Sequence, residues 1–253
     1  MADSQDSDFG LANIPFGIAS STKYPVPQPV TRLYNIVIFI RPLISTGLLS
    51  VTAEAEAAMS SSSLNQFASL GRKAHRDVRH QLKALLSGAT ASAILKDYGE
   101  SENNVTMHIP VLPRDFTDFV SSEDHGLNSM AAVTGKRFIQ PIFYRFPWGY
   151  GGRASSIVVS GSPINRPAGV YLASGSQGDG TFAYTEQLDF ELEIGVIVGK
   201  ALPYGESIDA ENAGEHMFGV VLVNDWSGKH PLLQYTSLGK LLANSYSSRY
   251  SNF

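Results

Sequence analysis

The sequence predicts a mainly β protein with some α, and two observations lead to this prediction. After about Met107, short β-like runs alternate with loops rich in Gly, Pro, Ser and Asn, which is typical of sheet proteins. The clearest of these runs are Ile157–Ser160, Glu191–Val198 and Phe218–Val223. Before that point, a stretch that begins at Leu64 has apolar residues at helical spacing. The change of pattern places a domain boundary near Met107, between residues 1–107 and 108–253.

The composition is that of a folded protein that needs no disulfides. The chain has 253 residues, of which 43% are hydrophobic and 17% are charged, so a sizeable core is expected and wholesale disorder is not. Cysteine is absent, which excludes disulfides, thiolate metal sites and cysteine nucleophiles. The formal net charge of -4 argues against a general nucleic-acid binder.

The apolar runs are too short to indicate a membrane protein. The polar stretch Met1–Asp8 has no basic region followed by an apolar core, so it does not match a secretory signal. The early run Ile36–Ile40 is far shorter than a bilayer span. We therefore expect a cytoplasmic protein with no membrane or nucleic-acid partner.

The N-terminal part is predicted to hold a loop, a strand and a helix. Residues 1–31 contain several prolines and are expected to be loop-like, whereas Leu33–Ile40 has strand propensity. A helix is predicted from Leu64 to the Ser87-Gly88 pair, which would end it. Its other side is basic, and His75 and His80 are expected to be solvated there. This basic side could line a nucleic-acid groove, but the net charge favours an ordinary solvated helix face.

The stretch Leu188–Gly199 is predicted to form a buried β-strand, although it carries two glutamates. Residues two apart in a strand point to the same side, so Glu191 and Glu193 share one face, while Leu192 and Ile194 occupy the other. Two neighbouring carboxylates in apolar surroundings repel each other and are costly to desolvate unless a positive group lies between them. A divalent cation with oxygen ligands would satisfy this requirement.

Two further acids are candidates for the same site. Asp225 ends the run that begins at Phe218, where it could face a site at the rim of the sheet, and Asp118 lies between aromatic residues. Each could equally be a turn or cap residue. A set of four carboxylates with no nitrogen or sulfur ligand would select Ca²⁺ or Mg²⁺ over zinc or copper.

Two loops carry the remaining candidates. His125 follows Asp118 by seven residues in a polar loop, and its side chain could act as a general base, although a lone loop histidine is more often structural. The segment Tyr150–Ser156 is predicted to be a glycine-flanked turn that enters a strand and could hold an anionic substrate. It matches neither a Walker loop nor a dinucleotide-binding motif.

Taken together and in this order, these pieces resemble the fumarylacetoacetase family of fumarylacetoacetate hydrolases. The resemblance covers most of residues 8 to 239. The matching segments are Asp8-Phe9, Asn13–Gly17, Leu64–Gly71, Asp115–Phe119 with His125, Gly149–Gly161, Leu188–Glu193 and Gly219–Ser227.

The resemblance implies a fold and a reaction. The fold would be a small SH3-like barrel domain with one long helix in residues 1–107, followed by the first part of a β-rich fumarylacetoacetase-type catalytic domain in residues 108–253. Family members form homodimers. They hydrolyse a carbon–carbon bond of 4-fumarylacetoacetate to give fumarate and acetoacetate, the last step of tyrosine and phenylalanine catabolism.

The resemblance also assigns roles to individual residues. The implied ligands of a Mg²⁺ or Ca²⁺ ion are Asp118, Glu191, Glu193 and Asp225. His125 would activate water as a base. Tyr150 and Tyr235 match positions that contact the substrate.

The sequence departs from the family pattern towards its end. Gly151 stands where the family usually has a histidine, and Asn244 stands at the position of an active-site lysine. Residues 240–253 diverge, and the family pattern continues well beyond them. We therefore expect an incomplete catalytic domain. The alternative to the hydrolase is a non-catalytic, truncated family member that retains only a divalent-metal site.

Overall fold

The structure is a computed structural model that describes residues 7–171, 181–228 and 249–252. The described chain divides into two compact units. The first comprises residues 7–112, 194–222 and 252, and the second comprises residues 113–171, 181–193, 223–228 and 249–251. The domain boundary predicted near Met107 stays a prediction.

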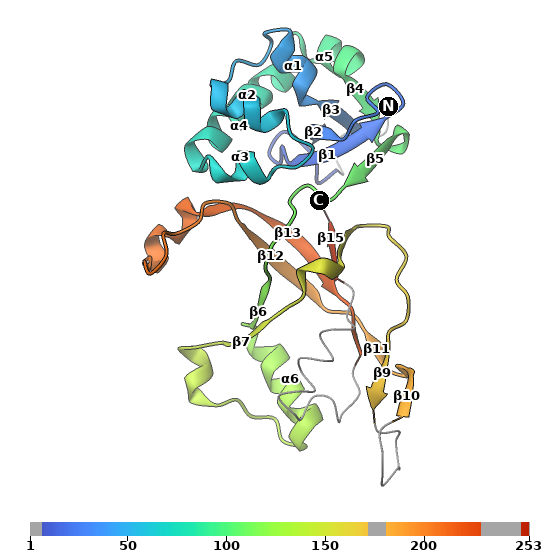
Figure 1. Ribbon diagram of the computed structural model, residues 1–253, viewed down its shortest axis with the longest axis vertical. Helices are drawn as coiled ribbons and strands as arrows, with labels where there is room; N and C mark the ends of the chain where they lie inside the picture. Colours follow the sequence, from blue (N-terminus) through green and yellow to red (C-terminus); the bar gives the residue numbers. More distant parts are fainter. Residues whose placement is uncertain (1–6, 172–180, 229–248, 253) are drawn as a thin grey trace. The chain divides into compact units, whose positions relative to one another are not determined.

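Strands outnumber helices among the described residues, and the predicted fold class, mainly β with some α, is confirmed. The N-terminal region forms ten of these elements, shown in blue to green in Figure 1. They are β1 (Phe16–Ser21), β2 (Gln28–Leu33), β3 (Ile36–Phe39), α1 (Ile40–Ser45), α2 (Ala53–Met59), α3 (Asn65–Ser69), α4 (Arg72–Ser87), α5 (Ala91–Tyr98), β4 (Gly99–Ser101) and β5 (Val105–His108). A short 3-10 helix, Glu102–Asn104, joins β4 to β5.

The five N-terminal strands form one curled antiparallel sheet in the order β4-β3-β2-β1-β5. One face of the sheet packs against the helices α1 to α5 (Figure 1), and Ile18, Ile38, Phe67 and Leu82 are fully buried between them. The opposite face carries a smaller apolar cluster of Ala19, Val30, Val37 and Phe39. Both faces of this sheet are therefore apolar.

The loop predicted for residues 1–31 is wrong, because β1 and the first four residues of β2 lie within it. The prolines suggested a loop, yet Pro29 lies inside β2, opposite Ile18 of β1. Val30 and Ile18 are buried on opposite faces of the sheet. Burial on both faces thus outweighs the local preference of proline for loops.

The single helix predicted from Leu64 is two helices. The chain turns at Gly71, whose φ of 84° lies in the left-handed region that favours glycine, so α3 ends before this residue and α4 begins after it. The apolar spacing runs through both helices, which is why the pattern alone did not reveal the break.

The prediction that His75 is solvated is also wrong. Its imidazole is buried and packs edge-on against the rings of Phe67 and Phe218, with centroid distances of 4.9 and 4.8 Å. Its Nε2 lies 2.8 Å from the backbone oxygen of Phe67. Two neighbouring basic residues stay exposed: Lys73 pairs with Asp77 at 2.6 Å, and His80 is exposed as expected.

The rest of the chain forms short strands and one further α-helix. These elements are β6 (Thr117–Val120), α6 (Glu123–Thr134), β7 (Trp148–Gly151), β8 (Ile157–Val159), β9 (Ala168–Tyr171), β10 (Thr181–Tyr184), β11 (Leu188–Asp189), β12 (Leu192–Val198), β13 (Met217–Asp225), β14 (Ser227–Gly228) and β15 (Arg249–Asn252). Three 3-10 helices, Pro141–Tyr144, Ala154–Ser156 and Ala210–Glu215, connect them. The strands make three two-stranded pairs, β6-β7, β9-β10 and β11-β14, and one sheet in the order β12-β13-β15-β8.

The strand β12 is not buried as the sequence predicted. Its apolar face is open, and Leu192 and Ile194 are each 74% exposed. Val220 and Leu222 of β13 are exposed as well. Side chains alternate along β12 as expected, and Glu193 lies on the more buried face. None of the described elements covers the apolar face.

No described helix is both long enough and apolar enough to span a bilayer.

Replacing a core leucine of the N-terminal unit should destabilise it strongly. Leu82 of α4 is fully buried in the cluster between the helices and the sheet. We expect Leu82→Ala to lower the free energy of unfolding by about 2–5 kcal/mol, because it removes apolar contacts and leaves a cavity. Urea unfolding followed by circular dichroism measures this. Leu48→Ala, at a 40% exposed position, is the control and should cost well under half as much.

The buried His75 should make the stability depend on pH. Burial lowers the pKa of the imidazole, and its bond to the Phe67 carbonyl offsets only part of this effect. As pH falls through about 6.5, the unfolded chain therefore takes up this proton before the folded chain does. The free energy of unfolding should fall with pH from about 6.5 down to the lowered pKa of the folded state.

Unfolding in urea at a series of pH values from 7.5 to 4.5 measures this dependence. His75→Phe should flatten the slope that begins near pH 6.5, because the variant has no proton to take up. His80→Phe, at an exposed position of the same helix, should leave the slope in place. An equal slope in the two variants would show that His75 does not cause it.

Candidate metal centre

Asp118 is positioned by the pairing of strand β6 with strand β7. The two strands are antiparallel, and Asp118 lies opposite Tyr150 in their register. Alternation along β6 turns Asp118 to the buried side and Phe119 to the exposed side. A Cβ at Gly149, opposite Phe119, would lie 2.6 Å from the Phe119 ring, so this ring covers the glycine.

Glu193 and Asp225 are positioned by a second antiparallel pair. Leu188 lies opposite Gly228, and the backbones of Glu191 and Asp225 exchange two hydrogen bonds of 3.1 and 2.9 Å in the same register. Glu193, two residues beyond Glu191, is therefore a diagonal neighbour of Asp225 on one face. Every second residue near the end of β13 is buried, and Asp225 is the last of these buried residues.

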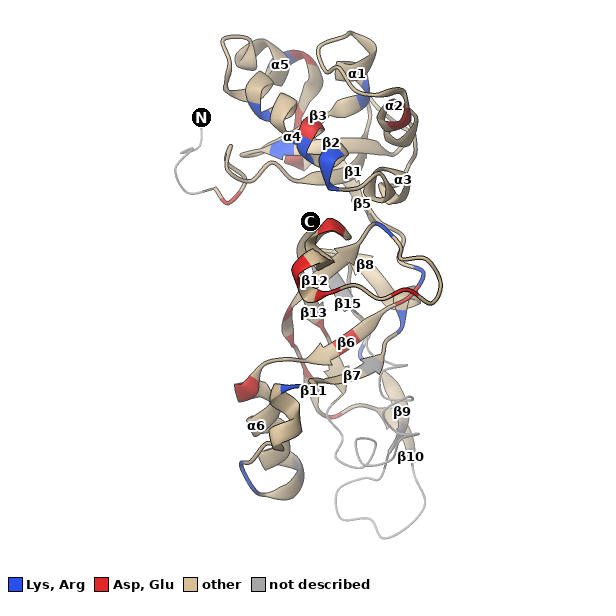
Figure 2. Cartoon of the chain, turned by 90° about the vertical axis from the view of Figure 1, so that its left-hand side faces the viewer, with Lys and Arg blue, Asp and Glu red and all other residues tan. Residues whose placement is uncertain are grey.

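These two pairs of strands bring three carboxylates together. One oxygen from each of Asp118, Glu193 and Asp225 lies within 4.8 Å of the others. Asp225 is 1% exposed, Asp118 is 8% exposed and Glu193 is half-buried. In Figure 2, acidic segments in red mark β6, β12 and β13.

The donor set fits a hard divalent cation. Three carboxylates so close together repel one another, and burial raises the cost because water screens the charges less. A cation between them would reverse that repulsion. Ligands that are all oxygen suit Mg²⁺ or Ca²⁺, and a set of three carboxylates does not discriminate between the two.

Glu191, the fourth predicted ligand, does not belong to this cluster of three. Its backbone pairs with that of Asp225, and its side chain is half-buried beside the cluster's strands. Its role as a ligand stays a prediction.

His125 lies in a helix and not in the polar loop that the sequence predicted. Ser122 caps the N-terminus of α6, accepting a bond of 3.3 Å from the His125 backbone N–H, and Glu123 and Asp124 occupy the first turn. A serine followed by two acids is a helix-start pattern that the sequence reasoning missed. The His125 side chain is exposed and is not part of the carboxylate cluster.

The two predicted substrate-contacting tyrosines are described only in part. The backbone of Tyr150 lies in β7 opposite Asp118, so the pairing of β6 with β7 places this position next to the carboxylate cluster. Tyr235 and Asn244 lie outside the described residues. The turn predicted at Tyr150–Ser156 starts as the end of a strand and continues into a 3-10 helix, where Arg153 Nε donates to Ser156 Oγ at 3.3 Å.

Family models match both parts of the chain. The fumarylacetoacetase N-terminal model matches residues 12–110, and the fumarylacetoacetate hydrolase C-terminal model matches residues 117–248. The chain belongs to the fumarylacetoacetate hydrolase family. All three clustered carboxylates lie within the part that matches the C-terminal model.

Curated fumarylacetoacetases from several organisms are similar to this chain. The enzyme of Aspergillus fumigatus is 35% identical over 96% of the chain, and those of Rattus norvegicus and Homo sapiens are each 34% identical over 98% of it. In all three cases the chain spans 60% of the relative's own length. A solved fumarylacetoacetate hydrolase of Exiguobacterium antarcticum is 18% identical with a TM-score of 0.45, over 86% of this chain and 57% of that one.

Neutralising one of the clustered acids should remove a ligand of the cation. We expect Asp225→Asn to weaken the binding of Mg²⁺ or Ca²⁺ at least about tenfold, because affinity depends on the number of charged ligands. Isothermal titration calorimetry measures this affinity. Glu206→Gln, which neutralises an exposed acid outside the cluster, is the matched control and should bind the metal as the parent chain does.

Thermal unfolding is a second measurement of metal binding by the Asp225→Asn variant. A cation that binds only the folded chain raises its melting temperature, and this rise should be lost in Asp225→Asn. A metal-dependent rise of equal size in both proteins would contradict the assignment.

Proposed function

We propose that this protein is a metal-dependent hydrolase that cleaves the carbon–carbon bond of 4-fumarylacetoacetate into fumarate and acetoacetate. The observation that carries the proposal is the cluster of Asp118, Glu193 and Asp225 within a chain of the fumarylacetoacetate hydrolase family. Relatives at 34–35% identity bear the name fumarylacetoacetase. This reaction belongs to the catabolism of tyrosine and phenylalanine.

The three carboxylates would hold the ion and fix its position. Glu191 would add a fourth oxygen from the strand position that faces Asp225. When bound, Mg²⁺ or Ca²⁺ would act as a Lewis acid and polarise the carbonyl oxygens of a β-diketone. The burial of Asp118 and Asp225 excludes water from their side of the site, which strengthens electrostatic interactions there.

His125 would take a proton from the attacking water. The imidazole is exposed in the first turn of α6, so water reaches it freely. Tyr150 and Tyr235 would contact and orient the substrate. The pairing of β6 with β7 supports this role for Tyr150, because it holds this residue opposite Asp118.

The proposal extends to assembly and location. We propose a homodimer, as the resemblance to fumarylacetoacetases implies, and we propose that it works in the cytoplasm. The partner of the protein is then a small molecule, with no role for nucleic acid or a membrane.

A second candidate function is metal binding without turnover. The open apolar face of β12, with Leu192 and Ile194 each 74% exposed, favours it, because soluble proteins rarely leave such a strand face in water. Under this alternative the carboxylate cluster would still bind its ion.

A direct assay tests the proposed reaction. The 253-residue chain is mixed with fumarylacetoacetate and Mg²⁺ or Ca²⁺, and the loss of substrate is followed by absorbance. We expect turnover that chelator abolishes and that falls about 10²–10⁴-fold in His125→Ala, the range for losing a general base. Metal affinity should be unchanged in this variant.

The control for this assay is His80→Ala, which removes an exposed histidine in α4 and should retain full activity. Binding of the metal without loss of substrate would overturn the hydrolase and support the second candidate. Turnover that survives in His125→Ala would remove His125 from the reaction while leaving the hydrolase itself intact.

A further inference from the structure

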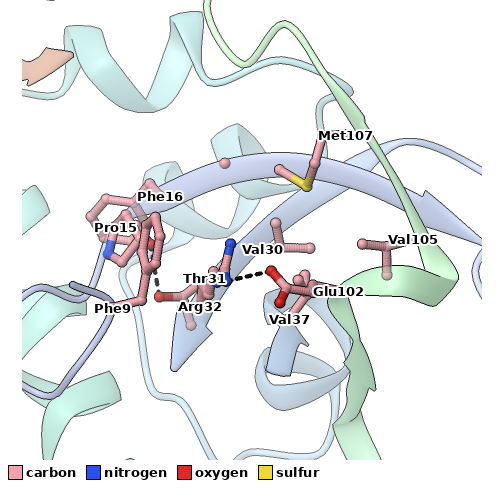
Figure 3. Close-up of a pocket in the computed structure, with 11 residues that line it drawn as sticks. Phe9, Pro15, Phe16, Val30, Thr31, Arg32, Val37, Glu102, Val105 and Met107 are labelled. Atoms are coloured by element: carbon pink, nitrogen blue, oxygen red, sulfur yellow. Dashed lines mark hydrogen bonds and ion pairs between the residues drawn. The ribbon is translucent and has the colours of Figure 1, made fainter. Parts of the chain in front are cut away.

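A pocket of about 130 Å³ lies on the second face of the N-terminal sheet, among residues that the metal centre does not use. Figure 3 shows the residues that line it. They come from the segment before β1, from β1, β2, β3 and β5, and from the 3-10 helix before β5. The pocket therefore lies on the open side of the curled sheet. In barrel-like folds, small ligands often bind at such a position.

The inner wall of the pocket is apolar. Val30 and Val37 are nearly fully buried at 2% and 3% exposure, and Val105 and Met107 close the side formed by β5. Position 17 keeps the space open because it is glycine. A Cβ there would lie 3.3 Å from Met107 Cε and 3.5 Å from Val30 Cγ2, so it would project into the room between these side chains.

The rim of the pocket is polar but has no net charge. Arg32 and Glu102 form an ion pair across it, drawn as a dashed line in Figure 3. The ring of Phe9 lies 4.0 Å from the Arg32 guanidinium, and Arg32 Nε donates to the Tyr34 backbone oxygen at 2.6 Å. These contacts hold the guanidinium in place. The pair offers a ligand one donor group and one acceptor group side by side.

We propose that this pocket binds a small neutral aromatic molecule that carries a hydroxyl group, such as a phenol. An apolar cavity of about 150 Å³ holds benzene, so the size is suitable for one ring. The thioether of Met107 makes favourable contacts with aromatic rings. A hydroxyl both donates and accepts, so it can donate to Glu102 while it accepts from Arg32.

The charges of the rim favour a neutral ligand. A carboxylate directed at Arg32 would lie beside Glu102, and an ammonium directed at Glu102 would lie beside Arg32, so each would meet repulsion as well as attraction. This site is independent of the proposed hydrolase activity, because its lining residues all precede residue 112 and none of them belongs to the carboxylate cluster.

Phenol, benzene and benzoate are the probes for this site. The chain has five methionines, and labelling their methyl groups with ¹³C lets each be followed by NMR in the full chain. Met107 is the one that lines the pocket. Titration with phenol should move the Met107 signal in a saturable way through the ring current, while the signal of Met130 stays in place. Benzene should bind about fivefold to tenfold more weakly than phenol, and benzoate at least as weakly as benzene.

Two variants test the two parts of the pocket. Gly17→Val fills the apolar room and should weaken phenol binding more than tenfold. Glu102→Gln keeps the room but breaks the ion pair, and it should reduce the preference for phenol over benzene to about twofold or less. Glu56→Gln, at an exposed position of α2, is the matched control for charge and should bind as the parent does.

If Gly17→Val does not fold, the Glu102→Gln variant still tests the proposal. It leaves the apolar wall unchanged, so a loss of the preference for phenol over benzene reports on the ion pair alone. The proposal is overturned if phenol produces no saturable shift of Met107. It is also overturned if benzoate binds as tightly as phenol, or if a folded Gly17→Val binds phenol like the parent.

Discussion

The reciprocal pair of backbone hydrogen bonds between Glu191 and Asp225 fixes the register on which the metal centre depends. Because side chains alternate along each strand, this register alone decides that Glu193 and Asp225 share a face. A slip by one residue would turn Glu193 away and bring Leu192 in its place. A second antiparallel pair, β6 with β7, holds Asp118 opposite Tyr150 and supplies the third carboxylate.

The N-terminal unit is stabilised by a different kind of interaction, the burial of apolar and aromatic side chains. Phe16, Phe67, His75 and Phe218 contact one another through their rings, so β13 is tied to β1, α3 and α4 within this unit. The imidazole joins this cluster only because the Phe67 backbone oxygen lies within bonding distance of Nε2. The same sheet is apolar on its second face, where a smaller buried cluster lies beside an open pocket.

The two sites differ in how they would select a ligand. The carboxylate cluster concentrates like charges and so favours a small divalent cation. The pocket in the N-terminal sheet pairs opposite charges at its rim and so favours a neutral molecule with both a donor and an acceptor. Membership of the fumarylacetoacetate hydrolase family gives a reason for the first site but says nothing about the second.

The sequence by itself determined the local features of this protein. Alternation along β12 placed Glu193 on the face opposite Leu192, and helical spacing located α4. The family resemblance named Asp118 and Asp225 as partners of Glu193, although they lie far away in the sequence. These features follow from short-range periodicity or from motifs, which a single chain displays directly.

Only the tertiary structure decided what those residues meet. It gathered three of the four predicted carboxylates, placed His125 in the first turn of a helix and buried His75 among aromatic rings. It also formed β1 and β2 in a proline-containing stretch, because pairing with neighbouring strands and burial on both faces outweigh local propensity. Burial and long-range pairing depend on residues that are distant in the chain, so no local pattern could have shown them.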